Sequence, residues 1–336
     1  MILHDKRQGH GLSEFGINIP VQDSRASRTF EHLAGHPRLG PRVGAWHRKP
    51  TGERLGVEDF YRAHSPEYVD RLFSDRLEDE LIRTYELINS EGQYYRYSPE
   101  NAIQPLSALF ERILSRVSGT WQSCRLAMTG GFCFYFGGGM HHAQWNYGNG
   151  FCLLNDIVIA IRRLQADRQI RQAWVIDTDV HKGDGTAALT RDDPTITTLS
   201  IHMAHGWPLD SDPVNAEGRR NPSFTPSDID IPIDRGEEDI YMDRLENGLA
   251  QLNVYPDPDM AVVVYGADPY LHDELPSTRK LQLTLKQMMD RDLLVYRFLQ
   301  HRNVPMAYLM AGGYGRRAWE VYSQFLEFVL LEKYSE

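Results

Sequence analysis

Short apolar runs alternate with longer segments of helical periodicity from about residue 125 to the end of the chain. Five of these runs are rich in β-branched and aromatic residues, and they predict buried strands at residues 132–136, 173–176, 196–200, 260–265 and 304–310. Strands separated by helices are typical of βαβ units, whose strands pair in parallel. The pattern therefore predicts an α/β protein with a central, mainly parallel, multi-stranded sheet flanked by helices.

The clearest βαβ unit lies near the C-terminus, between the strands predicted at 260–265 and 304–310. Thr284 is a suitable N-cap for the intervening helix, because its hydroxyl oxygen can accept a backbone N–H of the first turn. The apolar face of this helix comprises Leu285, Met288, Met289, Tyr296 and Leu299.

The first 100 residues are less regular, with polar loops and one helical segment at 66–72. The sequence contains no repeat, no low-complexity tract and no linker rich in proline, glycine or serine. We therefore expect a single domain over residues 1–336.

The composition is that of an ordinary globular protein, with 41% hydrophobic and 24% charged residues in a chain of 336. The net charge of -10 and the lack of any run of lysines or arginines argue against a nucleic-acid surface. The first residues lack the apolar stretch of a signal peptide, and no apolar run reaches the roughly 18 residues of a membrane span. We expect a protein that binds neither nucleic acid nor membrane.

Cysteine usage indicates the compartment. The chain has three cysteines, Cys124, Cys133 and Cys152, without a paired short spacing. An odd number of such residues fits a reducing compartment better than a disulfide framework, so a cytoplasmic location is expected.

The segment 174–185 runs an apolar strand directly into three carboxylates, an imidazole and two glycines. Side chains two positions apart on an extended backbone point to the same side, so Asp179 and His181 can face one ion while Asp177 lies behind them. These two side chains make half of a zinc coordination shell. A catalytic zinc site has three protein ligands and an open position, so a third ligand is expected from elsewhere in the chain.

Four of the predicted strands lead into loops that carry glycines and chemically active side chains. These loops begin at Gly137, Asp177, Gly266 and Ala311. In open α/β sheets ligands bind beyond the carboxyl ends of the strands, so the four loops are expected to converge on one pocket. Asp268, in the third of these loops, is the candidate for the missing metal ligand.

Two adjacent histidines, His141 and His142, belong to the first loop. Neighbouring side chains in an extended segment diverge, so these rings suit proton transfer better than joint binding of one ion. Asp177 and Asp184 are available to orient the rings by hydrogen bonds. Tyr314 can donate a hydrogen bond to a carbonyl oxygen that becomes an oxyanion. Together these groups indicate metal-assisted hydrolysis of an amide.

These segments together resemble the histone deacetylase superfamily, which includes zinc-dependent lysine deacetylases and bacterial acetylpolyamine amidohydrolases. The resemblance rests on residues 138–143, 150–156, 177–185, 266–268 and 312–314. Their sequences are Gly-Gly-Met-His-His-Ala, Gly-Phe-Cys-Leu-Leu-Asn-Asp, Asp-Thr-Asp-Val-His-Lys-Gly-Asp-Gly, Gly-Ala-Asp and Gly-Gly-Tyr. The resemblance implies a bacterial-type lysine deacetylase with the arginase/deacetylase fold.

The resemblance implies that the protein hydrolyses the amide of a lysine side chain carrying an acetyl or other short acyl group. One zinc ion per chain would activate water, the histidine pair would serve as general base and acid, and the tyrosine would stabilise the oxyanion. The implied zinc ligands are Asp179, His181 and Asp268, and the implied catalytic residues are His141, His142, Tyr314, Asp177 and Asp184. The expected partner is an acylated lysine in a protein or peptide, or a small acyl-amine.

The resemblance also implies a substrate tunnel and a potassium site. Phe151, beside Gly150, would form one wall of a narrow acyl-lysine tunnel. Leu275 and Trp207 are candidates for further lining. The implied potassium ligands are Asp177, Asp179, His181, Ser200 and Ile201.

Three departures from the superfamily pattern matter. The segment 202–222 does not align with the opposite wall of the tunnel, which leaves the substrate specificity open. Lys182 stands where many members have a second histidine, and we expect it outside the metal shell. Residues 91–100 include no recognisable counterpart of the acidic rim residue that grips the substrate backbone in eukaryotic deacetylases. That difference weakens the expectation of a protein substrate.

Three alternatives stay open. An amidohydrolase of acetylpolyamines or related acyl-amines would use the same chemistry, although polyamine enzymes usually carry Pro-Pro-Gly where this chain has Gly-Gly-Met before the histidines. A binuclear manganese ureohydrolase shares the fold but needs more bridging carboxylates than the segment 268–270 provides. A non-catalytic acyl-lysine binding protein would have no need of Tyr314 beside a complete ligand set.

Overall fold

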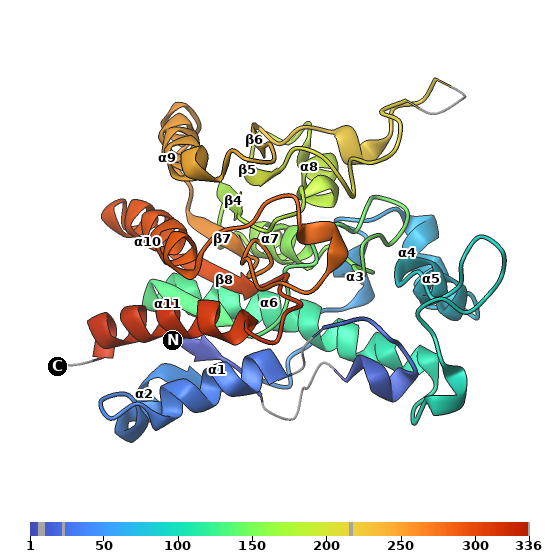
Figure 1. Cartoon of the computed structure of the whole chain (residues 1–336), viewed down its shortest axis with the longest axis horizontal. Helices are drawn as coiled ribbons and strands as arrows, with labels where there is room; N and C mark the ends of the chain where they lie inside the picture. Colours follow the sequence, from blue (N-terminus) through green and yellow to red (C-terminus); the bar gives the residue numbers. More distant parts are fainter. Residues whose placement is uncertain (6–10, 22–23, 215–217, 335–336) are drawn as a thin grey trace.

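The computed structural model describes residues 1–5, 11–21, 24–214 and 218–334. Within these residues eight parallel strands form one sheet, in the order β2-β1-β3-β8-β7-β4-β5-β6. Figure 1 labels five of them, from β8 to β6. The strands are β1 (Ile2–Leu3), β2 (His47–Arg48), β3 (Phe132–Tyr135), β4 (Ala173–Asp177), β5 (Ile196–Met203), β6 (Ile229–Ile233), β7 (Met260–Tyr265) and β8 (Met306–Met310). The predicted α/β class with a parallel sheet is confirmed.

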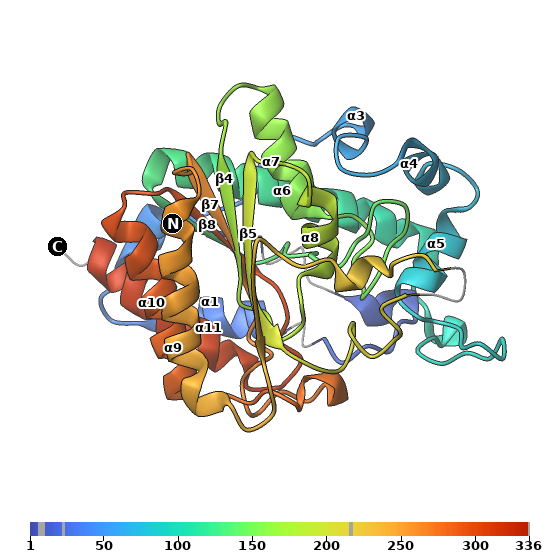
Figure 2. The same ribbon diagram turned by 90° about the horizontal axis from the view of Figure 1, so that it is seen from above.

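Helices cover both faces of the sheet, which Figure 2 shows nearly edge-on. On one face lie α6 (Leu109–Gly130), α7 (Asp156–Ala166) and α8 (Asp184–Thr190), and on the other lie α1 (Ser24–Gly35), α9 (Tyr241–Gln251), α10 (Leu285–His301) and α11 (Ala318–Tyr334). The shorter helices are α2 (Val43–Trp46), α3 (Val57–Phe60), α4 (Pro66–Leu72) and α5 (Leu77–Thr84). No helix in the described part of the chain has both the length and the apolar character that crossing a lipid bilayer requires.

The central strands are buried on both faces. In β7, Val262 and Val264 belong to the apolar core beneath α6 and α7, whereas Val263 and Tyr265 belong to the core beneath the opposite helices. Successive side chains of a strand point to opposite faces, so a strand covered on both sides needs apolar residues at every position. This is why the central strands are continuous apolar runs in the sequence.

All five predicted strands are present, with ends that differ by up to three residues. Three strands were not predicted. β1 and β2 have two residues each, too few to show a period. β6 lies at an edge of the sheet, where Asp230 is half-buried and Pro232 is exposed, so its sequence lacks a continuous apolar run.

Helix α10 begins where the sequence predicts. Oγ1 of Thr284 accepts the N–H of Gln287 (3.2 Å), and the side chain of Gln287 accepts the N–H of Thr284 (3.0 Å). This reciprocal pair satisfies two backbone donors that the helix itself leaves free. The helix predicted at 66–72 is also present, as α4.

The sheet order explains where a site can form. β3, β8, β7 and β4 are consecutive neighbours in the sheet, and all of them are parallel. Their carboxyl ends therefore lie side by side on the same side of the sheet, and the loops that follow them are adjacent in space.

Candidate active site

The loops that follow β3, β8, β7 and β4 meet beyond the carboxyl ends of these strands. The N–H of Gly312, after β8, donates to Oδ2 of Asp179, after β4 (2.9 Å). Nδ1 of His141, after β3, lies 2.6 Å from Oδ2 of Asp177, the last residue of β4. The structure thus brings together the four loops that the sequence predicts to converge.

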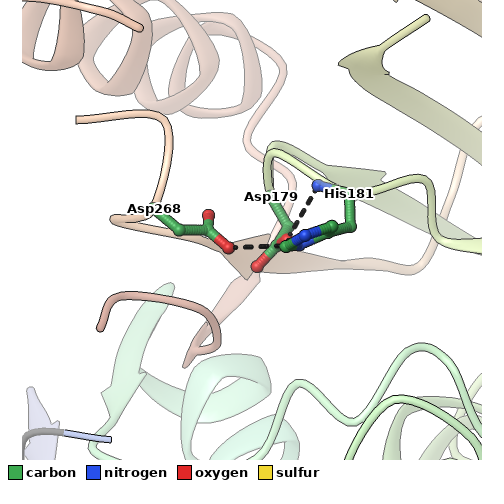
Figure 3. Close-up of side chains that lie close together, drawn as sticks. All are labelled: Asp179, His181 and Asp268. Atoms are coloured by element: carbon green, nitrogen blue, oxygen red, sulfur yellow. Dashed lines mark hydrogen bonds and ion pairs between the residues drawn. The ribbon is translucent and has the colours of Figure 1, made fainter. Parts of the chain in front are cut away.

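Asp179, His181 and Asp268 form a buried cluster that can hold a metal ion (Figure 3). Each offers one ligand atom, and these atoms all lie within 4.8 Å of one another. Nδ1 of His181 is 3.3 Å from Oδ1 of Asp179 and 3.5 Å from Oδ2 of Asp268. The first two residues follow β4 and the third follows β7, and the direct pairing of these strands brings the three side chains together.

The surroundings of the cluster fit a cation. Within the described residues, the buried Oδ2 of Asp268 accepts no hydrogen bond. Nε2 of His181 lies 3.1 Å from Oγ of Ser277, so Nδ1 is the ring nitrogen that faces the carboxylates. A methyl group on Gly312 would overlap the carboxylates of Asp179 and Asp268, so the backbone can pass this closely only at a glycine. Two carboxylates and one imidazole around one point suit a zinc site with an open position.

The charges in the cluster also favour a cation. Burial and the charge of Asp179 raise the pKa of Asp268 to about 7. Burial opposes a charge on His181, but Asp179 and Asp268 outweigh it and raise the pKa of the ring to about 9. Burial acts on Asp179 as well, but His141 and His181 outweigh it and hold the pKa of that carboxyl below its usual range. Positive charge is therefore stabilised between the two carboxylates.

His141 and His142 are each paired with one carboxylate. Nδ1 of His141 lies 2.6 Å from Oδ2 of Asp177, and Nδ1 of His142 lies 2.6 Å from Oδ1 of Asp184. The second oxygen of Asp184 accepts a hydrogen bond from Oγ of Ser223 (2.6 Å). With Nδ1 engaged, Nε2 of His142 is left for a substrate, a water or an ion, whereas Nε2 of His141 lies 3.8 Å from Oδ1 of Asp179.

The two histidine rings differ in charge. Burial disfavours the charged form of His141, but Asp177 and Asp179 outweigh it and raise the pKa of the ring to about 10. Burial and the neighbouring His141 lower the pKa of His142 to about 4. The carboxylates therefore favour a proton on His141, whereas burial and His141 disfavour one on His142, which leaves His142 the better proton acceptor.

A cavity of about 160 Å³ opens at His142 and at His181 of the candidate metal-binding cluster. Its lining residues are Glu86, Arg96, His142, Gly150, Phe151, His181, Trp207, Leu275, Ser277 and Tyr314. The four tunnel residues that the sequence suggests, and the candidate catalytic tyrosine, thus lie around one cavity. The ring of Trp207 packs edge-on against that of His142, with centroids 4.5 Å apart.

A sequence model of the histone deacetylase domain matches residues 19–327. The chain belongs to the histone deacetylase family. This match includes all the strand-end loops that build the cavity. Membership supports a hydrolytic deacetylase, and the buried cluster of Asp179, His181 and Asp268 suits a family of metal-dependent enzymes.

Several relatives span most of the chain. It is 34% identical over 264 residues to an uncharacterized protein of Picosynechococcus sp., covering 78% of this chain and 81% of that protein. It is 26% identical to the acetoin utilization protein AcuC of Bacillus subtilis, covering 81% of this chain and 67% of that protein. It is 28% identical to histone deacetylase 2 of Arabidopsis thaliana, covering 63% of this chain and 52% of that protein.

Lys182, the departure from the commonest motif of the superfamily, contacts β6 instead of the metal cluster. Its buried Nζ donates to Oδ1 of Asp230 (2.7 Å), whose other oxygen lies 3.5 Å from Nε2 of His202. This contact agrees with the expected place of Lys182 outside the metal shell.

Two of the candidate potassium ligands, Asp179 and His181, also belong to the candidate zinc-binding cluster. The register of β4 and β5 places Ser200 opposite Asp177, and Oγ of Ser200 accepts the N–H of Gly183 (3.3 Å). Ile201, the next residue of β5, is buried. Strand pairing thus brings these candidates beside one another, and binding of potassium there stays a prediction.

Sequence reasoning missed three residues of the cavity lining, namely Glu86, Arg96 and Ser277. Glu86 lies outside the segment 91–100 in which an acidic rim residue was sought. None of the three belongs to a motif or to a periodic segment, so the sequence carries no signal for them.

Arg291 was also missed, although the sequence holds a signal for it. Its Nη1 donates to the carbonyl oxygens of Thr178 and Gly266, at 2.9 Å each, and so joins the two loops that carry the metal cluster. Arg291 lies on the buried side of α10, between Met288 and Val295. A charged residue at an apolar position of a helix indicates a buried partner.

Proposed function

We propose that the protein is a zinc-dependent deacylase that hydrolyses the amide between a short acyl group and the side-chain nitrogen of lysine, within one catalytic domain over residues 1–336. The observation that carries the proposal is the cavity whose lining includes His142, His181 and Tyr314, directly over the cluster that Asp179 and Asp268 complete. A metal-ligand set, a neutral imidazole and a phenol at one cavity suit amide hydrolysis.

Asp179, His181 and Asp268 would hold the zinc ion, one per chain. Zinc, when bound, would lower the pKa of water and polarise the substrate carbonyl. Ser277 would orient the ring of His181 through its contact with Nε2, because a ring fixed at one nitrogen presents the other in a defined direction.

His142 would accept the proton of the attacking water and return a proton to the departing amine. It suits this role because it lines the cavity, is neutral at pH 7 and is held at Nδ1 by Asp184. His141, cationic and paired with Asp177, would add positive charge beside the oxyanion. The amide C–N bond breaks, and water supplies the hydroxyl of the acid and the proton of the amine.

Tyr314 would donate its hydroxyl hydrogen to the substrate oxygen as that oxygen becomes negative. Burial raises the pKa of Tyr314 well above its usual value, with the carboxylates of Asp268 and Asp179 adding to the effect. The phenol therefore keeps its proton at neutral pH and stays a donor.

The walls of the cavity suit an aliphatic chain. Phe151, Trp207 and Leu275 provide apolar contacts for the four methylenes of a lysine side chain, with Gly150 leaving room beside them. The proposal includes potassium near the zinc ion, at Asp177, Asp179, His181, Ser200 and Ile201. It also includes a cytoplasmic location, which three buried cysteines without disulfides support.

The test is hydrolysis of acetyl-lysine peptides, free acetyl-lysine and acetylpolyamines by the purified protein loaded with zinc. We expect hydroxamate-sensitive release of acetate that a chelator abolishes and zinc restores. Tyr314→Phe should lower kcat roughly 10²–10³-fold with zinc content unchanged, whereas Tyr94→Phe, at an exposed site, should behave like the parent. No hydrolysis of any of these amides by the zinc protein would refute the proposed function, and two bound manganese ions would favour a ureohydrolase instead.

A further inference from the structure

The lining of the cavity carries two opposite charges in addition to the candidate catalytic groups. Glu86 and Arg96 both line the cavity, and Nη1 of Arg96 forms an ion pair with Oε2 of Glu86. Their side chains are 45% and 23% exposed, whereas those of His142 and His181 are at most 5% exposed. The charged pair therefore marks the mouth of the cavity and the histidines mark its floor.

Both residues belong to the segment that follows α5, which we call the rim loop (residues 85–98; Figure 1). The backbone oxygen of Arg96 accepts the N–H of Asn18 (2.8 Å), and the N–H of Tyr95 donates to the oxygen of Leu87 (2.9 Å). The second bond joins the two ends of the loop, which places Glu86 near Arg96, and the first attaches the loop to the segment of Asn18.

The cavity wall itself positions the guanidinium of Arg96. Its Cζ lies 5.3 Å from the ring centroid of Phe151 and 4.8 Å from that of Tyr95. Cation–π contacts on two rings restrict the planar group, so less freedom is lost when it binds a second anion. Phe151 thus connects the apolar wall to the charged mouth.

The ion pair leaves capacity for further partners. Among the described residues, its polar contact joins one guanidinium nitrogen to one carboxylate oxygen. The remaining N–H groups of Arg96 can bind another carboxylate, and Oε1 of Glu86 can accept from an ammonium. A substrate whose end carries both an ammonium and a carboxylate would pair each of them with one residue, so that the four charges alternate in sign.

We propose that Glu86 and Arg96 bind the α-ammonium and the α-carboxylate of a free amino acid, so that the preferred substrate is a free Nε-acyl-lysine. This inference rests on the proposed function of the site. An acyl-lysine places its amide at the floor and its α-carbon, four methylenes away, toward the mouth. The charged groups of the free amino acid are thereby presented to the two residues.

The charges at the mouth also disfavour the other substrate classes. A polyamine carries only positive charges beyond its amide, so Arg96 would repel it while Glu86 attracts it. An acyl-lysine within a polypeptide has neutral amides in place of both charges, so it offers neither residue an ionic partner. The balanced charge of the pair matches a zwitterion.

The test compares steady-state kinetics on a matched substrate set with the zinc protein. The set comprises free Nε-acetyl-lysine, its Nα-acetyl derivative, its C-terminal amide, the doubly blocked compound and N-acetylputrescine. We expect kcat/KM to fall roughly five- to tenfold for each blocked charge, mainly through KM, because the head group contacts the mouth and not the reacting bond.

Two variants test which of the two residues binds which charged group of the substrate. Glu86→Gln should remove the preference for a free α-ammonium and keep that for the α-carboxylate, and Arg96→Gln should do the reverse. Glu91→Gln is the matched control, since Glu91 lies in the same rim loop but outside the cavity lining. Titration of each uncleaved substrate into the Tyr314→Phe protein provides the same comparison as an equilibrium Kd.

The outcomes separate the inference from the proposed function. The assignment of Glu86 and Arg96 would be overturned by equal kcat/KM for the free and the doubly blocked compound, or by a preference for acetylputrescine. It would also be overturned if both variants lost kcat/KM equally on every substrate. None of these results would contradict the deacylase activity. Failure of the zinc protein to hydrolyse any of the five amides would overturn the proposed function.

Discussion

At the scale of single residues, the buried cluster of Asp179, His181 and Asp268 has an electrostatic arrangement that favours a cation. Asp179 and Asp268 lie close together in a buried place, and His181 between them has its pKa raised to about 9. Without an ion, protons on His181 and Asp268 supply the positive charge that the carboxylates stabilise. Binding of zinc must displace these protons, since metal ligands bind in their deprotonated forms.

Proton release on metal binding is therefore the first prediction. With pKa values of about 9 for His181 and about 7 for Asp268, we expect release of about one to two protons per zinc ion at pH 7. Affinity for zinc should rise with pH up to the pKa of His181 and level off above it. Calorimetric titration in buffers of different ionisation enthalpy measures the number of protons, and a binding enthalpy independent of buffer would contradict the prediction.

A second prediction concerns the glycine that passes beside the carboxylates. In Gly312→Ala the added methyl would overlap Asp268 and Asp179, so the ligands must separate. We expect zinc to bind at least about tenfold more weakly, as when groups that support a metal site are altered. Gly130→Ala is the control, because a Cβ there meets no atom within 4 Å. Equal zinc occupancy of both variants in a competition with a chelator would show that the close approach is unimportant.

At the scale of elements, α10 fixes the two loops that carry the metal cluster. Arg291 is fully buried, pairs with Asp292 of the same helix (2.7 Å) and donates to the carbonyl oxygens of Thr178 and Gly266. One side chain thus connects α10 to the loops after β4 and β7. A cation without solvent access is held only where such partners surround it.

The third prediction follows from this connection. Arg291→Met leaves the buried Asp292 without its cationic partner, so the free energy of unfolding should fall by about 3–5 kcal/mol. Arg297→Met, on the same helix, removes a partly exposed pair with Glu332 and should cost about 1 kcal/mol or less. Urea unfolding of the metal-free proteins measures both effects. Similar losses in the two variants would contradict a special role for the buried arginine.

At the scale of the whole molecule, the metal cluster joins segments that are far apart in the chain. Asp179 and Asp268 are brought together only when β4 and β7 pair, so the unfolded chain has no formed site. An ion that binds the folded state alone shifts the folding equilibrium in its favour. The metal is thus expected to stabilise the fold as well as to assist the reaction.

The fourth prediction is a dependence of thermal stability on zinc. At a free zinc concentration 100 times its Kd, the folded state should gain about 2.7 kcal/mol. Differential scanning calorimetry should show a lower Tm in a chelator and recovery when zinc is added back. Asp268→Asn, which loses one carboxylate ligand, should show a smaller zinc-dependent shift. A Tm unaffected by both chelator and zinc would argue against a metal ion at this place.

The sequence alone predicted the fold class and the candidate catalytic chemistry. Apolar runs alternating with segments of helical period indicated a parallel sheet, and in such a sheet the carboxyl ends of all strands lie on the same side. That rule was sufficient to predict that Asp179, His181 and Asp268 meet. The residues of the cluster lie immediately after strands, where local sequence position and spatial position are closely related.

Other features depended on packing between distant segments. Edge strand β6 alternates apolar and polar residues over only five positions, one of them a proline that weakens the strand signal, and β1 and β2 are too short to show a pattern. Arg291 contacts a residue 113 positions away, and the pair of Glu86 and Arg96 meets the cavity because its loop folds back on Asn18. Such contacts follow from the path of the whole chain, which no local period encodes. Periodicity and strand ends predicted the residues of the candidate site, and long-range packing built the mouth of its cavity.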